Sequence, residues 1–348
     1  MELTTVWFLL IAVLWIGYFV LEGFDFGVGI LLPVLGRDDT DRRVMINTIG
    51  PVWDGNEVWL LVAGGATFAA FPEWYASLFS GFYLPLFLIL VALILRGVAF
   101  EYRGKIDTPL WRGNWDKAIV FGSGLPALLW GVAFANIVHG VPLSSEHRFT
   151  GNLFTLLHPY ALLGGLTTLG LFTLHGAVFL ALKTDGDIRV RARALAWRLS
   201  VPVVLIAALF LLWTQLDKGT VGSGVLSLLA ALALVGAVLA NRIGREGWAF
   251  TATAATILLA VSALFAALWP DVLPSTVNPA TNGLNVHNAS STPYTLKVMT
   301  WVAAFGTPVV LLYQGWTYWV FRARLTREAI PGGAALAPAA GAGPAAGG

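Results

Sequence analysis

Five ionisable residues interrupt apolar stretches in the first third of the chain. Glu22 and Asp25 lie three residues apart in LEGFDFGVG. Asp54 and Glu57 repeat that spacing in GPVWDGNEVW, and Arg96 follows in LILRGVAFEYR. Residues three apart on a helix share a face, and carboxyl groups withdrawn from water tend to hold protons. The residue types and their spacing therefore indicate proton transfer.

Ligands for a metal or a haem are scarce. The chain has no Cys, five His and three Met, which excludes disulfides, thiolate metal sites and c-type haem attachment. His175 is the one histidine expected deep within a span and hence the one candidate haem ligand. A hydrogen bond to a neighbouring helix accounts for it more simply. We expect no metal site on the chain, and the sequence contains no recognisable catalytic triad or nucleotide-binding loop.

The composition indicates a membrane protein. Of 348 residues, 57% are hydrophobic and 11% are charged, with a mean hydropathy of +0.75, whereas soluble domains carry about 25% charged residues. A water-soluble globular domain is therefore excluded. The net charge of +2 points to no charged partner, and nucleic acid is not among the partners we expect. We predict an all-α polytopic membrane protein in contact with a lipid bilayer.

About 20 apolar residues in a helix cross the roughly 30 Å hydrocarbon core of a membrane. We assign residues 1–323 to a single nine-helix membrane domain. Residues 324–348 are predicted to form a disordered cytoplasmic tail, because an Ala/Gly/Pro-rich segment cannot bury a core. By the length criterion, the nine transmembrane helices are predicted at 6–32, 52–71, 76–101, 118–138, 156–182, 199–216, 224–240, 250–269 and 296–321.

The distribution of Lys and Arg sets the orientation. Of these 21 residues, 17 fall in loops or span ends on one side, against Arg148, Lys218 and Lys297 on the other and Arg96 within a span. Cytoplasmic loops carry the excess of positive residues. The N-terminus is therefore predicted to lie outside and the C-terminus in the cytoplasm.

On this topology the ionisable residues share the cytoplasmic half of the membrane. A helix rise of 1.5 Å per residue puts Asp25 at a depth of about 15 Å, Arg96 at about 10 Å and Asp54 at about 5 Å. His175 falls in the same half, and Glu101 lies at the interface. A charge at mid-bilayer costs about 2.5–3.5 kcal/mol, so a cluster at one depth favours a polar pathway open to the cytoplasm. Structural hydrogen bonds between helices remain the alternative.

Several segments resemble one known family. They are YFVLEGFDFGVGILLPVLGRDDTDRRVMINTIGPVWDGNEVWLLVAGGATFAAFP, RGVAFEYR, HGAVFLALKT and MTWVAAFGTPVVLLYQGWTYWVFR. Together they are similar to subunit II of the cytochrome bd quinol oxidases, over about residues 4–323. The GPVWDGNEVW segment is the most specific of them.

The resemblance implies a respiratory complex of the bacterial plasma membrane that transfers electrons from quinol to oxygen. In that family, subunit I carries haems b and d, and subunit II is a haem-free, similarly folded nine-helix partner in the heterodimer. Small accessory membrane subunits and a structural quinone occur in some relatives. The implied role is to support subunit I and to provide part of a cytoplasmic proton route for reduction of oxygen to water.

The resemblance also implies roles for single residues. Asp54 matches the aspartate of a hydrophilic pathway from the cytoplasm, and Trp53 matches a wall of that pathway. Glu22 and Asp25 match family-pattern residues, and we assign them to the same route because they belong to the acid cluster. Glu57 is assigned to the route as well, although relatives often have a neutral amide at its position. From the residues alone, Arg96 is the charge partner of these acids.

Two other classes of function are open from the residues alone. A secondary transporter with a buried acidic site would also carry polar residues at depth, but it usually has broken helices at a midplane site. A purely structural scaffold would carry acids that are dispensable for the rate.

Overall fold

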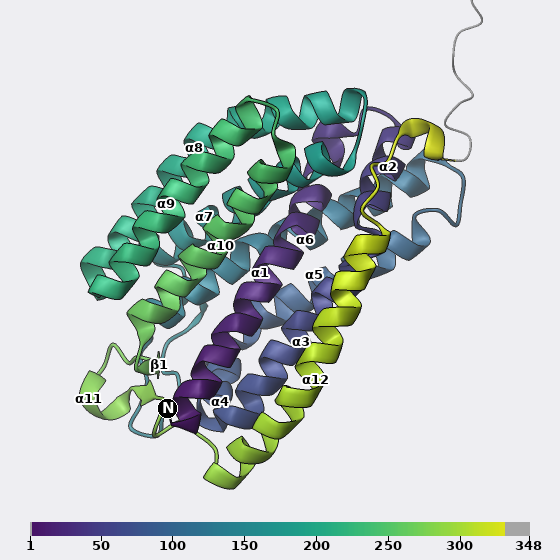
Figure 1. Ribbon diagram of the computed structural model, residues 1–348. Coiled ribbons are helices and arrows are strands. Elements are labelled where there is room, and N and C mark those ends of the chain that lie inside the picture. Colours follow the sequence, from purple (N-terminus) through teal and green to yellow (C-terminus); the bar gives the residue numbers. More distant parts are fainter. Residues whose placement is uncertain (1, 331–348) are drawn as a thin grey trace, which may run out of the picture.

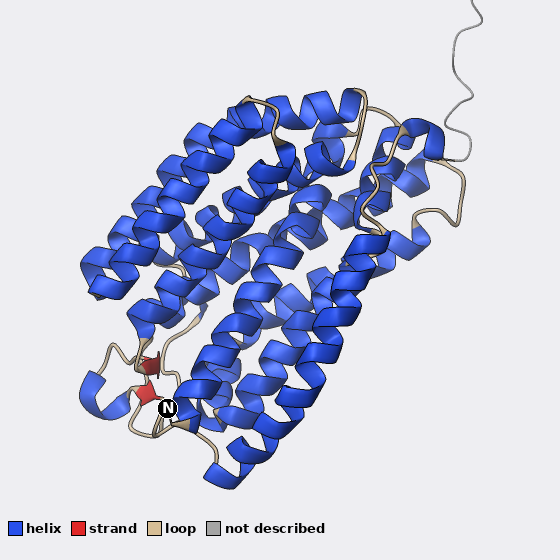
Figure 2. Ribbon diagram, viewed as in Figure 1, coloured by secondary structure: helices blue, strands red, loops and turns tan. Residues whose placement is uncertain are grey.

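The computed structural model describes residues 2–330, and the described chain is almost entirely helical (Figures 1 and 2). Nine long helices run side by side as a bundle. They are α1 (Leu3–Leu35), α3 (Trp53–Ala70), α5 (Tyr83–Tyr102), α6 (Pro109–His139), α7 (Pro159–Lys183), α8 (Asp187–Lys218), α9 (Val221–Arg242), α10 (Glu246–Leu268) and α12 (Pro293–Val320).

Short elements close the two ends of the bundle. One end, here called the α2 end, carries α2 (Asp39–Ile49) and η2 (Arg327–Ala329). The opposite end, the α11 end, carries the N-terminus and a two-stranded antiparallel sheet (Figure 2). Its short elements are α4 (Pro72–Gly81), η1 (Leu153–Leu156), β1 (Asp271–Leu273), α11 (Pro279–Asn282) and β2 (Leu284–Asn285).

Eight of the described helices are long and apolar enough to cross a membrane. This confirms the all-α, multi-pass prediction. The remaining long helix, α3, has 18 residues and begins with the polar WDGNE segment, so it does not meet the same hydropathy criterion. The count of nine spans and the orientation stay predictions.

The third predicted span, 76–101, is wrong at its start. The chain forms α4 and α5 there, separated at Phe82. Pro85 explains the break, because a proline inside a helix has no N–H to donate and its ring clashes with the carbonyl four residues earlier, here that of Gly81. The hydropathy pattern is continuous across the break, so it gave no sign of it.

Several helices extend beyond their predicted spans at the α2 end. Helix α8 begins at Asp187 and α6 at Pro109, although the spans were predicted from 199 and 118. The unpredicted helix α2 has Asp38 as its N-cap, with the side chain accepting from the Asp41 N–H. Hydropathy detects the part of a helix inside the membrane and does not report its polar continuation.

Close backbone contacts hold α1 at the centre of the bundle. A Cβ added to Gly27 of α1 would lie 2.1 Å from the carbonyl oxygen of Phe172 in α7, and Gly176 faces Gly27 across the same contact. Small residues at such a crossing allow two membrane helices to approach closely. By contrast, Gly64 and Gly65 of α3 have no described atom within 4 Å of an added Cβ.

Ion pairs join the segments at the α2 end. The Asp41 carboxyl group is 1% exposed and accepts from Arg191 of α8 at 2.6 Å and from Arg327. Arg103, at the end of α5, donates to Asp39 of α2 and to Asp116 of α6. These ion pairs link α2 to three other segments, and Val44, Met45 and Ile49 of α2 add buried apolar contacts.

Residues 321–330, here called the C-terminal strap, lie across this network. Leu325 forms a parallel bridge with Thr184, and Ile330 is buried. The hydrogen bond from Arg327 lowers the pKa of the Asp38 carboxyl group, so this pair stabilises the strap above the ordinary aspartate pKa and loses that effect as the pH falls through the lowered value. The described chain includes residues 324–330 of the predicted tail, and the rest of that tail, 331–348, lies outside the described residues.

We expect Asp41→Asn to release the C-terminal strap, because a buried carboxylate that pairs with two arginines is costly to lose, at about 3 kcal/mol or more. Tryptic cleavage after Arg322, Arg324 and Arg327 in the detergent-solubilised protein should become at least about tenfold faster. The control is Asp107→Asn, which removes an 88% exposed partner of Arg112 and should leave the rate unchanged. Equal cleavage rates in both variants would contradict the anchoring role of Asp41.

Candidate functional site

A buried guanidinium is the centre of the site. Arg96 of α5 is 0% exposed, and its Nη2 donates both to Glu22 Oε1 of α1 and, at 3.2 Å, to Glu57 Oε2 of α3. The guanidinium carbon lies 4.7 Å from the centre of the Phe26 ring. Three helices therefore meet at one cation.

The charges of this cluster do not balance. Two carboxylates face one guanidinium, which stays protonated in proteins. Glu22 Oε2, Arg96 Nε and Arg96 Nη1 are buried and have no partner among the described residues. An excess of negative charge in a low-dielectric site is relieved when one carboxyl group binds a proton. The cluster can therefore hold and release one proton while the guanidinium keeps a charged partner.

A second polar chain runs from α12 to Asp25. Asn56 of α3 donates to Asp25 Oδ2 at 2.7 Å, and its own oxygen accepts from Gln314 Nε2 at 3.2 Å and from the Tyr318 hydroxyl at 2.7 Å. Gln314 Oε1 in turn accepts from the indole N–H of Trp59 at 2.8 Å. Asp25 thus belongs to a network distinct from the arginine cluster, on the same stretch of α1.

Asp54 and Trp53 lie at the mouth of the site. Asp54, the second residue of α3, is exposed and has no hydrogen-bond or ion-pair partner within residues 2–330. Glu57 follows one turn deeper with 24% of its side chain exposed. The Trp53 ring is half-buried and lies 5.2 Å from the Phe100 ring, centre to centre. Exposure therefore falls stepwise from Asp54 through Glu57 to the buried Glu22.

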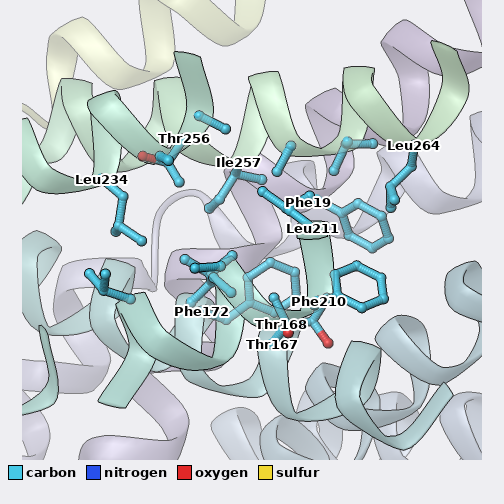
Figure 3. A pocket seen from close by; sticks show the side chains of 18 of the residues that line it. Phe19, Thr167, Thr168, Phe172, Phe210, Leu211, Leu234, Thr256, Ile257 and Leu264 are labelled. Atoms are coloured by element: carbon cyan, nitrogen blue, oxygen red, sulfur yellow. The ribbon is translucent and has the colours of Figure 1, made fainter. Parts of the chain in front are cut away.

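An apolar cavity of about 90 Å³ lies away from these acids, between α7, α8, α9 and α10 (Figure 3). Phe19 and Phe172 form part of its wall. The hydroxyl groups of Thr167, Thr168 and Thr256 donate to helix carbonyl oxygens at 2.6–2.8 Å. Their protons are thus already used, so the cavity suits a hydrocarbon chain better than a polar headgroup.

Comparison with known proteins shows the family. The family model described as cytochrome bd terminal oxidase subunit II matches residues 3–321. The chain belongs to the cytochrome bd oxidase subunit II family. It is therefore a subunit of a quinol-oxidising oxidoreductase complex and a multi-pass protein of the bacterial plasma membrane.

Individual relatives agree over nearly their whole length. Cytochrome bd ubiquinol oxidase subunit 2 of Bacillus subtilis is 42% identical, covering 94% of this chain and 98% of its own. Cytochrome bd-I ubiquinol oxidase subunit 2 of Escherichia coli K12 is 39% identical, covering 93% and 96%. A chain in the structure of bd oxidase from Geobacillus thermodenitrificans shares the fold, with a TM-score of 0.74 at 18% identity, over 92% of this chain and 99% of that one.

A cytochrome bd complex contains haem. His175 is fully buried in the bundle, so we ask whether it could be an axial haem ligand. His175 Nδ1 lies 2.6 Å from the Thr253 hydroxyl, and Nε2 lies 3.2 Å from the Val20 carbonyl oxygen. The ring also stacks on Phe250 at 4.7 Å. Both nitrogens are engaged and one ring face is covered, so His175 does not fit an axial ligand. Within residues 2–330, no group of three or more His, Asp or Glu side chains could hold a metal ion.

The prediction from sequence missed the amide part of the site. It named Glu22, Asp25, Asp54, Glu57, Trp53 and Arg96, and the structure joins Glu22 and Glu57 through Arg96. It did not name Asn56, Gln314 or Tyr318. Gln314 could have been noticed, because an amide inside the apolar LLYQGW segment also needs a polar partner. Asp25 meets α3 through this amide chain.

We expect Arg96→Met to destabilise subunit II strongly, by about 3–5 kcal/mol, because it leaves the buried Glu22 carboxyl group and the partly buried Glu57 carboxyl group without their cation. The yield of purified complex and its thermal unfolding temperature should both fall. Combining Arg96→Met with Glu22→Gln and Glu57→Gln should restore most of the loss. Arg148→Met, which removes an 80% exposed partner of Glu146, serves as control. A stable single Arg96→Met variant would show that the cluster is not held together by this cation.

Proposed function

We propose that this subunit binds no haem, supports the haem-bearing subunit I, and provides part of the proton route from the cytoplasm to the site where oxygen is reduced. The observation that carries the proposal is the graded series of acids on adjacent helices. Asp54 is exposed at the α2 end, Glu57 is partly exposed one turn deeper, and Glu22 is buried against Arg96. Protons can enter at such a series and be held at its buried end.

The proposed direction follows from the membrane orientation. The loops at the α2 end carry most of the Lys and Arg residues, and cytoplasmic loops have this excess, so we assign the α2 end to the cytoplasm. We also assign α3 as a membrane span, which brings the proposed number of spans to nine. Quinol, named as the substrate of the Bacillus subtilis and Escherichia coli relatives, is the proposed electron donor. Reduction of oxygen consumes protons, and drawing them from the cytoplasm generates a membrane potential.

The face formed by α3, α5 and α12 is the proposed contact with subunit I. The most apolar window of α12 is only 6% buried in its own chain, against 28–67% for the other seven candidate spans. Gly64, Gly65 and Gly306 on this face have no described atom within 4 Å of an added Cβ. A helix held so loosely by its own chain needs a partner, and the small residues allow that partner to approach. Asp54 lies at the edge of the same face.

Two further expectations concern bound groups. A structural quinone remains a prediction without assigned residues, since the apolar cavity offers it no free polar group. His175, with both nitrogens engaged, supports the assignment of haems b and d to subunit I.

We expect Asp54→Asn to slow quinol oxidase turnover about tenfold or more, because loss of a proton-transferring group typically costs at least this factor. Haem content should be unchanged, because the exposed Asp54 side chain supports no other contact in the described chain. Turnover is measured by oxygen consumption, and proton uptake by a dye inside vesicles. The control is Glu101→Gln, which neutralises another exposed acid at the same end. Unchanged turnover and proton uptake in Asp54→Asn would exclude the relay role and favour a structural scaffold.

We expect Gly306→Trp to separate the two subunits, because an indole would occupy the space that the partner needs. The haem that co-purifies with affinity-tagged subunit II should fall about tenfold, in line with the 1–3 kcal/mol typical of overpacking. The control is Gly236→Trp on α9, an equally open glycine away from the proposed face. Normal haem recovery with Gly306→Trp would place subunit I on another face.

A further inference from the structure

The hydrogen bonds around Asn56 have only one consistent direction. The indole of Trp59 can donate and cannot accept, so the Gln314 atom that it contacts at 2.8 Å must be the oxygen. The NH₂ group of Gln314 therefore points at Asn56, and the Asn56 atom that receives it at 3.2 Å must also be an oxygen. The Tyr318 hydroxyl donates to the same oxygen at 2.7 Å. Because Trp59 can only donate, it fixes the orientation of the Gln314 amide, and Gln314 in turn fixes the orientation of the Asn56 amide.

The orientation of Asn56 determines how it meets Asp25. With its oxygen committed to α12, Asn56 presents its NH₂ group to Asp25 Oδ2 at 2.7 Å. That carboxyl oxygen must accept. The better acceptor of a protonated carboxyl group is its carbonyl oxygen, so a proton on Asp25 belongs on Oδ1. Asp25 Oδ1 is buried and has no partner among the described residues.

We infer that Asn56 is a positioning residue that holds Asp25 with Oδ2 as acceptor and Oδ1 as the atom that binds and releases the proton. The inference rests on the proposed proton route and adds a function for residues outside the acid series. Gln314 and Tyr318 of α12 lock the Asn56 amide, and Trp59 locks Gln314. Besides these amides, the ionisable groups facing Asp25 are Glu22 of its own helix, Glu57 of α3, Arg96 of α5 and Tyr318 of α12.

The inference gives α12 a second function. This helix contacts α1 and α3 but little else of its own chain, and two of its side chains set the amide that faces Asp25. Displacement of α12 would free the Asn56 amide to rotate. Seating of α12 against subunit I and the orientation of the Asp25 carboxyl group are therefore coupled.

The experiment measures Asp25 by infrared spectroscopy of the assembled oxidase. The carbonyl stretch of a protonated Asp25 is assigned as the band that Asp25→Asn removes. In Asn56→Leu the band should move to higher frequency, because the carbonyl oxygen loses its donor, and turnover should fall about tenfold, as expected for loss of a hydrogen bond to an ionisable group. Trp59→Phe removes only the indole donor that fixes the Gln314 amide. It should broaden the Asp25 band and cause a smaller loss of turnover.

The control is Asn136→Leu. Asn136 is another buried amide, which bonds to Val132, Leu156 and His158 near the α11 end. It should leave the Asp25 band in place. If Asp25→Asn has normal turnover, Asp25 is not on the proposed route. A further outcome is that Asp25→Asn is slow while no band can be assigned to Asp25, or while that band keeps its frequency in Asn56→Leu and its width in Trp59→Phe. In either case the route stands and the positioning role of Asn56 is wrong.

Discussion

The burial of Arg96 constrains the rest of the fold. A guanidinium cannot be deprotonated at any accessible pH, and a charge in the hydrocarbon region costs several kcal/mol unless it is paired. The helix that carries Arg96 must therefore lie beside helices that carry acids. Glu22 of α1 and Glu57 of α3 fulfil this need, which holds α1, α3 and α5 together. The close approach of α1 and α7 at Gly27 and Gly176 then ties this trio to the other half of the bundle.

Charges inside the bundle and charges at its ends obey different rules. At the α2 end, Asp39, Asp41 and Asp116 are each matched by arginines from neighbouring segments, and the result is a stable network. Around Arg96 the acids outnumber the cation, and several polar atoms lack partners. The imbalance is what distinguishes the site from an ordinary set of structural ion pairs.

Sequence reasoning recovered the parts of the fold that follow from hydropathy. It located the apolar part of every long helix, because a run of apolar residues of the right length has few alternatives in a membrane, but it began α8 at 199 instead of Asp187 and α6 at 118 instead of Pro109. It missed the break before Pro85 and the helix α2, because both depend on backbone geometry and capping. For the site, it named the acids and the arginine, since each one interrupts an apolar run, but it did not name Tyr318. It did not name Asn56 and Gln314, because an uncharged amide costs less in a membrane than a charge and therefore stands out less, and the contact between them joins residues 258 positions apart.

The loose attachment of α12 also bears on how the complex is made. This helix is the last to emerge during synthesis, when the other long helices can already pack against one another. Its own chain offers it polar anchors, such as Trp7 with Thr300 at one end and the C-terminal strap at the other, but almost no apolar cover. A subunit II synthesised without its partner would present this uncovered helix to the lipid and to membrane proteases. With α12 as the proposed contact with subunit I, the subunit would complete its fold only when the oxidase assembles, and this helix would act as a checkpoint in biogenesis.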